Sequence, residues 1–280
     1  MRYQIRDQIL QLNSLRDHQR IVFLTTCFEF PFDTTRALEL ALFRTFCVPS
    51  ISSLLDRTGE FARRPQKRYD DTDIIVSELI EWGYDSERGR RALERMNRLH
   101  RRHAIANDDY RYVLSTFVFE PIRWNQRFGW RLMLEQERHA MFHFWREVGR
   151  SMGIRDLPED YDAFERFNRD YEARHFRYSE ANQRVGNATV DLFAGWFPRP
   201  LAPLVRLSIY ALLEPAVRQA FAFPTPPRLW CWLVVRGLEA RARLLRWLPP
   251  RRRPRLRTAM PHPSYPTGYT LNQLGPPGDH

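Results

Sequence analysis

The stretch that most constrains this chain, residues 68–105, has the pattern of two consecutive helices separated by Gly83. Its first half, residues 73–82, is rich in apolar side chains and suits a buried helix. Ser86 is placed to cap the second helix. Side-chain oxygens that could cap the free amide groups of the first helix stand just ahead of it, on Asp70, Asp71 and Thr72.

The second predicted helix carries a histidine on an apolar face. Residues three and four apart share a helix face, and this spacing groups Leu93, Met96, Asn97, His100 and Ala104. Such a histidine is either a core residue with a local hydrogen bond or a ligand. Arg68 and Thr72 lie one helical turn apart, and the second helix can fold back on the first. An Arg, a Thr and a His in an apolar interior would suit haem, whose iron binds imidazole and whose propionates accept charge-assisted hydrogen bonds.

Composition favours helices throughout. The chain has only 12 glycines in 280 residues and no regularly alternating strands, which predicts an all-α fold. Aromatic residues make up 14% of the chain and could line a flat apolar cofactor pocket. We expect a single helical domain with a globin-like core over residues 1–227, a basic amphipathic helix over 228–257, and a Pro/Gly-rich tail over 258–280 that lacks a packed core.

Within the main domain, four further stretches have helical signals. They predict an amphipathic helix over residues 1–20, a helix capped at Asp33 or Thr34 and closed by Pro49, a helix over 134–152, and a long helix that opens at Asp160 and continues to residue 193.

The charge of the chain is strongly positive, +11, and nearly all of the basic residues are arginine. Such a balance serves nucleic acid, an anionic membrane surface or solubility, and no motif of a nucleic-acid-binding protein supports the first. In residues 228–248, tryptophan and arginine share one amphipathic helix. This pattern fits either a helix lying in a membrane interface or a helix docked on the domain with a solvated basic face.

The cysteines and the amino terminus bear on the compartment. Cys27, Cys47 and Cys231 are far apart and have no C-x-x-C spacing, so neither a disulfide framework nor a zinc site is indicated. Residues 1–20 are too charged for a signal peptide or a transmembrane helix. We therefore expect a cytoplasmic protein with, at most, a peripheral membrane contact.

Six sequence blocks have a distinctive composition: RTGEF at 57–61, KRYDDT at 67–72, RMNRLH at 95–100, NDDYRYVLSTFVFEPIRW at 107–124, FGWR at 128–131 and FWREVG at 144–149. Together they resemble the MpaB-type oxygenases, a family related to the latex-clearing rubber oxygenase. The resemblance runs from about residue 31 to 224. Members of this family are all-α, bind b-type haem in a buried pocket between helices, and use dioxygen to cleave unsaturated isoprenoid chains.

The resemblance implies roles for individual residues. His100 becomes the proximal ligand of the haem iron, and Arg68 and Thr72 match the Arg-x-x-x-Thr pair beside the haem, with a catalytic and a cofactor-binding role. The rubber oxygenase has a lysine three residues after that arginine that can reach the iron from the distal side. This chain has Asp71 there, so lysine ligation is not expected.

Two further residues have a looser match. Glu60 lies upstream of Arg68, roughly where the rubber oxygenase has its catalytic base, and a carboxylate in a dry pocket could remove an allylic proton. The alternative is a solvated Glu in a polar turn. His175 is the second candidate for the iron ligand, or a residue near the haem on the distal side.

These observations favour a haem b-dependent oxygenase that uses dioxygen on a hydrophobic, unsaturated, isoprenoid-like small molecule, with oxidative cleavage of a C=C bond as one outcome. The competing hypothesis is a non-enzymatic helical protein that binds lipid or a partner through its basic carboxyl-terminal segment. A di-iron enzyme is disfavoured because no Glu-x-x-His pairs occur on two helices.

Overall fold

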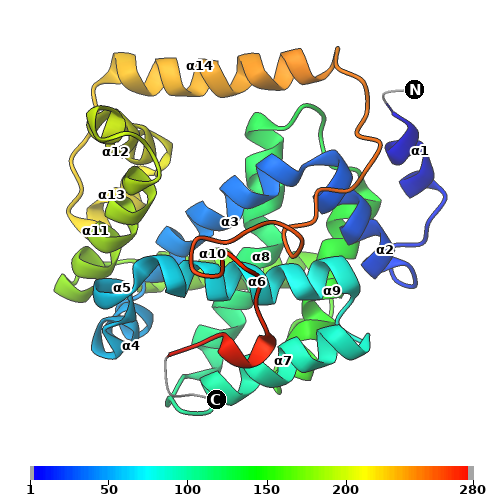
Figure 1. Cartoon of the computed structure of the whole chain (residues 1–280), viewed down its shortest axis with the longest axis horizontal. Helices are drawn as coiled ribbons and strands as arrows, with labels where there is room; N and C mark the ends of the chain where they lie inside the picture. The colour runs from blue at the N-terminus through cyan, green and yellow to red at the C-terminus, as the bar shows by residue number, and fades with distance from the viewer. Residues whose placement is uncertain (1–2, 277–280) are drawn as a thin grey trace.

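The computed structural model describes residues 3–276, and within that range it consists of helices and connecting segments without a β-strand (Figure 1). The prediction of an all-α chain is confirmed. The helices are, in chain order, α1 (Gln4–Leu10), α2 (His18–Phe23), η1 (Leu24–Glu29), α3 (Pro31–Phe46), α4 (Pro49–Thr58), α5 (Glu60–Arg63), α6 (Pro65–Trp82), α7 (Glu87–His100), α8 (Asn107–Phe128), α9 (Glu135–Ser151), α10 (Tyr161–His175), α11 (Glu180–Gly195), η2 (Arg199–Leu201), α12 (Ala202–Leu212), α13 (Pro215–Phe221), α14 (Arg228–Leu245) and η3 (Leu271–Gln273).

The long helix α8 organises the core. It packs against α3, α9 and α10, and its residues Val118 and Phe119 are fully buried among side chains from those helices. Helices α6 and α7 form an antiparallel pair, as the turn at Gly83 predicts. This pair crosses the lower half of the view in Figure 1, with α3 above it and α8 passing behind it. The interior between these helices holds the site described below.

The first helix of that pair begins earlier than the sequence indicates. Helix α6 starts at Pro65, so Asp70, Asp71 and Thr72 lie inside it and do not cap it. Proline suits the first turn of a helix because its φ is already helical and its missing N–H would have no intrahelical partner. The predicted end and the next start are confirmed: Gly83 has a φ of 84°, and the Ser86 hydroxyl accepts a hydrogen bond from the Gly89 amide.

Two predicted long helices are interrupted. The expected helix over residues 1–20 consists of α1 and α2 with a turn between them, where Asn13 accepts hydrogen bonds from the amides of the turn. The expected helix beyond Asp160 is divided into α10 and α11, and Ser179 caps the second part. In both places a short polar side chain competes for backbone groups and favours a turn over helix continuation.

The expectation that the tail lacks a packed core is wrong for the part of it that the structure describes. Tyr265 and Leu274 are buried against Ile74 and Ile75 of α6. We call residues 254–276 the C-terminal strap, because in Figure 1 they run down from α14 and across α6 to α7. The composition of the strap predicts that it has no hydrophobic core of its own. Its apolar side chains pack instead against the apolar face of α6.

Of the helix expected over residues 228–257, α14 has the expected start at Arg228 but ends at Leu245, and it packs against α12 and α8. It forms the upper edge of the molecule in Figure 1. Among residues 3–276, no single helix is both long and apolar enough to cross a membrane; α3 and α4 meet that criterion only when taken together, and a bend of 99° separates them.

Candidate functional site

A cavity of about 880 Å³ lies in the interior between α3, α4, α6, α7 and α8. This volume is at the upper end of the range for sites that bind small molecules or cofactors. Most of its wall is hydrocarbon, including side chains of Leu38, Leu42, Ile75, Leu79, Val113, Leu114, Phe117 and Val148. Such a wall excludes water and strengthens any electrostatic interaction inside.

His100 reaches this cavity from the last turn of α7. Its ring meets the ring of Tyr110 edge to face, with 5.5 Å between the centroids. Burial, and then the charges of Arg68 and His103, lower the pKa of His100 to about 4. The imidazole is therefore uncharged near pH 7. Its Nδ1 atom is buried and has no hydrogen-bond partner in the part of the chain that the structure describes.

Arg68 and Thr72 line the cavity from α6. Arg68 Nη1 donates a hydrogen bond to Thr72 Oγ1, and the hydroxyl of Thr72 donates to the Arg68 carbonyl at 3.1 Å. Burial lowers the pKa of Arg68, although Asp71 and Glu60 oppose the shift. No carboxylate forms an ion pair with this guanidinium within residues 3–276. A desolvated cation without a counter-ion is suited to bind the carboxylate of a ligand.

These observations fit a haem. A neutral imidazole with an unpartnered nitrogen can donate its lone pair to iron, and a buried guanidinium can pair with a propionate. Among the described residues, no group of three or more His, Cys, Asp or Glu side chains could hold a metal ion. Haem requires only one such protein ligand because the porphyrin supplies the others.

Glu60 also lines the cavity, and its side chain is only 12% exposed, so it is not the solvated residue of the alternative interpretation. Arg64 binds both of its oxygens, at 2.6 and 3.0 Å. His175 lies elsewhere: it ends α10, stacks on Tyr171 with 4.1 Å between ring centroids, and is absent from the cavity wall. The structure therefore brings together His100, Arg68, Thr72 and Glu60 and leaves His175 outside.

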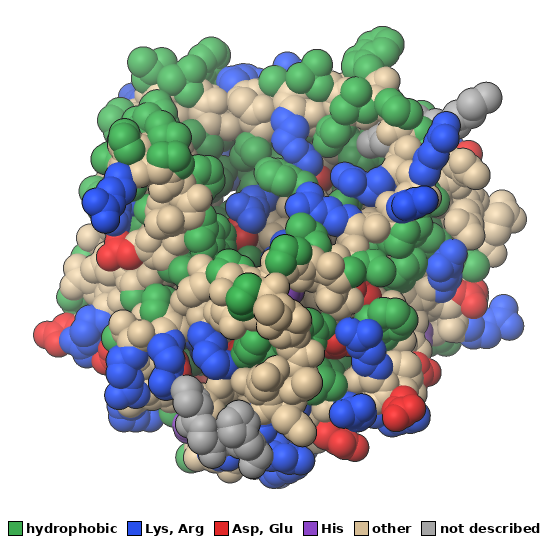
Figure 2. All heavy atoms as spheres, viewed as in Figure 1, with side chains coloured by type: hydrophobic (Ala, Val, Ile, Leu, Met, Phe, Trp, Pro, Cys, Tyr) green, Lys and Arg blue, Asp and Glu red, His purple; other side chains and the backbone are tan. Residues whose placement is uncertain are grey.

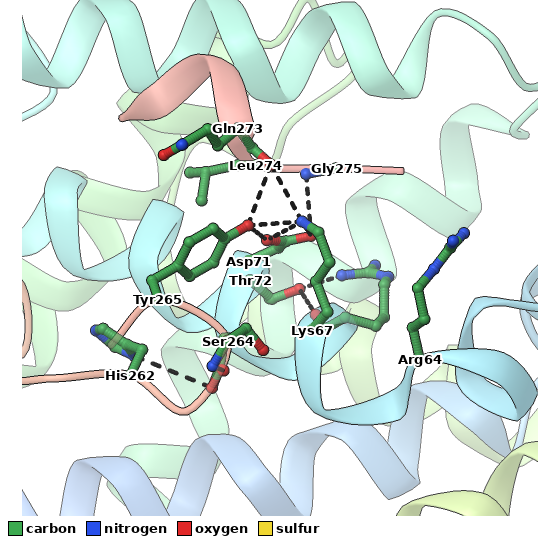
Figure 3. Close-up of polar contacts among 12 residues, drawn as sticks. Arg64, Lys67, Asp71, Thr72, His262, Ser264, Tyr265, Gln273, Leu274 and Gly275 are labelled. Atoms are coloured by element: carbon green, nitrogen blue, oxygen red, sulfur yellow. Dashed lines mark hydrogen bonds and ion pairs between the residues drawn. The ribbon is translucent and has the colours of Figure 1, made fainter. Parts of the chain in front are cut away.

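The carboxylate of Asp71 points toward the C-terminal strap and holds it (Figure 3). Its carboxylate accepts hydrogen bonds from the Tyr265 hydroxyl at 2.5 Å and the Gly275 amide at 2.9 Å, and it forms an ion pair with Lys67 at 3.0 Å. The last described residues of the strap, Gly275 and Pro276, are part of the cavity wall.

Sequence analysis missed Glu39, which faces the same cavity from α3. It is 6% exposed, accepts a hydrogen bond from the Tyr69 hydroxyl at 2.9 Å, and forms an ion pair with Arg36 at 2.5 Å. Burial raises the pKa of Glu39 to about 7 against the opposing effects of Arg36 and Tyr69. It can hold or release a proton near neutral pH. The sequence feature that could have indicated its burial is the position of Glu39, an acidic residue within an apolar run of α3.

Comparisons with known proteins identify the family of this chain. A family model described as "ER-bound oxygenase mpaB/B'/Rubber oxygenase, catalytic domain" matches residues 40–247. The ER-bound oxygenase mpaB' of Penicillium brevicompactum is 28% identical over 242 residues, which are 80% of this chain and 57% of that protein. The ER-bound oxygenase mpaB of the same fungus is 29% identical over 71% of this chain and 55% of its own length.

The mpaB of Penicillium roqueforti (strain FM164) is 27% identical over 71% of this chain and 73% of that protein. The chain spans little more than half the length of the two Penicillium brevicompactum relatives. The family match nevertheless covers most of the chain and includes Glu60, Arg68, Thr72 and His100, so this chain belongs to the family of ER-bound oxygenases mpaB/B' and rubber oxygenases.

Proposed function

We propose that this chain is a haem b-dependent oxygenase that uses dioxygen on a hydrophobic, unsaturated, isoprenoid-like small molecule, with oxidative cleavage of a C=C bond as one outcome. The observation that carries the proposal is the uncharged, unpartnered imidazole of His100 beside the buried guanidinium of Arg68 in an apolar cavity. The oxygenase names of the relatives support the class of reaction.

In this proposal His100 would hold the haem iron, and Arg68, oriented by Thr72, would hold a propionate. The bound haem would supply the activation of dioxygen, which protein side chains do not provide. The aliphatic wall would bind the hydrocarbon chain and exclude water. Glu39 and Glu60 are two of the carboxylates in the wall and could accept a proton from the substrate; burial raises the pKa of Glu39 to about 7.

The haem content of the purified protein tests the proposal. Protein produced with an adequate haem supply is expected to be red-brown, with a Soret band and about one b-type haem per chain. Pyridine haemochrome analysis measures this ratio. Absence of haem after reconstitution with haemin would overturn the proposal. It would favour the competing hypothesis of a non-enzymatic protein that binds lipid or a partner.

We also propose that the edge formed by α14 contacts an anionic membrane, and the word "ER-bound" in the names of the relatives agrees with such a contact. Large apolar side chains are exposed along and next to this helix, and Figure 2 shows hydrophobic atoms gathered over it; they include Leu201, Leu204, Leu229, Trp232, Leu233, Leu244, Trp247 and Leu248. Exposed arginines alternate with them, at Arg228, Arg236 and Arg243. Tryptophan and leucine beside arginine suit the interface of an anionic bilayer.

The variant W232E/L244E/W247E tests the membrane contact. Each exposed side chain would bury hydrocarbon worth about 1.5 kcal/mol or more, so vesicle affinity is expected to fall by at least about a hundredfold. Sedimentation with vesicles of phosphatidylcholine and phosphatidylserine measures the loss. The control Tyr178→Glu changes another exposed aromatic residue, between α10 and α11, and is expected to bind as wild type. Unchanged sedimentation of the triple variant would contradict the contact.

A further inference from the structure

The cavity has a second cationic region, separate from Arg68. Arg255 and Arg257 of the C-terminal strap contribute to its wall. Arg68 donates a hydrogen bond to Thr72 within α6, whereas the backbone of Arg255 is bonded to Cys27 of η1. The two arginines therefore belong to different parts of the cavity wall, Arg68 to α6 near His100 and Arg255 to the strap beside η1.

The carboxylates of the second region have partners other than Arg255. Asp73 is paired with Arg257 at 2.5 Å and Glu39 with Arg36 at 2.5 Å. Glu81 accepts hydrogen bonds from the amides of Arg257 and Thr258. The side chain of Arg255 has no ion pair or hydrogen bond in the described part of the chain. Partial burial, and then the charges of Arg257, Arg251 and Arg36, lower the pKa of this guanidinium. Because the pKa of Glu39 is raised to about 7, the counter-charge of Arg36 is itself incomplete near neutral pH.

Arg255 is also fixed in place and accessible. Its amide donates a hydrogen bond to the Cys27 carbonyl at 2.9 Å, which ties the strap to the wall of the cavity. The residue is exposed, so it stands where the cavity meets solvent. Figure 2 shows Lys and Arg side chains gathered around a hollow beneath α14. The same cavity wall includes the apolar side chains of Leu38, Val76 and Ile80.

An unpaired guanidinium at the opening of an apolar cavity selects for an amphiphile. We propose that Arg255 determines substrate specificity by binding the anionic group of the substrate, a carboxylate or a phosphate monoester, while its unsaturated hydrocarbon chain extends along the aliphatic wall toward His100. The planar fork of arginine matches both anions with paired hydrogen bonds. The direction toward His100 rests on the proposed oxygenase function; the anion site itself does not.

Three ligands with the same chain and different head groups test the proposal: farnesoate, farnesyl phosphate and farnesol. Their affinities for the full-length protein are measured by isothermal titration calorimetry at low ionic strength, below the critical micelle concentration. At least one of the two anions is expected to bind about tenfold or more tightly than farnesol. The anion with the higher affinity identifies the head group. Equal affinity for all three ligands would overturn the proposal.

Variants locate the effect. Arg255→Gln is expected to remove the preference for the anion and to leave the affinity for farnesol unchanged. Arg255→Lys keeps the charge and is expected to retain part of the preference. The control Arg253→Gln changes a nearby exposed arginine outside the cavity wall and is expected to bind as wild type. An anion preference that persists in Arg255→Gln would overturn the proposal, and melting curves establish that each variant is folded.

The haem content of the same samples is measured separately. Protein that lacks haem would overturn the oxygenase function and leave the Arg255 result valid. Protein that binds haem but does not distinguish farnesoate and farnesyl phosphate from farnesol would overturn only the anion site.

Discussion

His100→Ala is expected to lose nearly all of its haem. The substitution removes the only imidazole that the structure places in the cavity with an unpartnered buried nitrogen, and it leaves the haem with apolar contacts and the guanidinium of Arg68. Even residues that only orient a metal ligand contribute about ten- to a hundredfold in affinity, so loss of the ligand itself should exceed that. Pyridine haemochrome analysis and the rate of haem transfer to apomyoglobin measure the change.

The matched control is His175→Ala, which removes an imidazole that stacks on Tyr171 away from the cavity wall. It is expected to retain wild-type haem content. Adding imidazole to His100→Gly should restore part of the Soret band, because free imidazole can occupy the space of the missing side chain. The reverse result, with haem lost from His175→Ala and kept in His100→Ala, would move the ligand to α10.

The parts of this site that could be predicted from sequence depend on local geometry. Arg68 and Thr72 are adjacent because they lie one turn apart on α6, and His100 faces the same interior because the turn at Gly83 folds α7 back on α6. Both relations follow from helical periodicity and a turn signal that are visible over a few residues. The fold class was predictable for the same reason.

The parts that could not be predicted depend on long-range contacts. The placement of His175 depends on the break between α10 and α11, which local apolar spacing does not indicate. The role of Asp71 depends on partners 194 and 204 residues later, Tyr265 and Gly275, and the composition of that segment resembles a disordered tail. Glu39 is buried because α3 is enclosed by other helices, which the sequence of α3 alone does not establish.

Deleting residues 258–280 is expected to destabilise the whole domain and to prevent haem retention. The deletion exposes Ile74 and Ile75 and removes the buried side chains of Tyr265 and Leu274, each worth about 1.5–3 kcal/mol. It also removes an acceptor of the Arg95 guanidinium, the Leu274 carbonyl at 2.8 Å. A hydrogen bond to a charged group contributes about 1.5–3 kcal/mol. The sum is comparable with the total stability of a domain, about 5–15 kcal/mol.

Thermal melting and haem content of the truncated protein test this expectation. A milder variant distinguishes a loss of stability from a loss of the residues that line the cavity. Tyr265→Phe removes one hydroxyl that donates to Asp71, which should cost about 1–2 kcal/mol and leave haem content unchanged. If the strap were an accessory tail, as its composition suggests, the truncated protein would melt and bind haem as the full chain does. The expected result is a graded loss of stability, small for Tyr265→Phe and nearly complete for the deletion, with haem lost from the deletion alone. It would establish that this Pro- and Gly-rich segment forms part of the core of this oxygenase-family domain. The segment does so because it covers the apolar face of α6 and completes the cavity wall at Gly275 and Pro276.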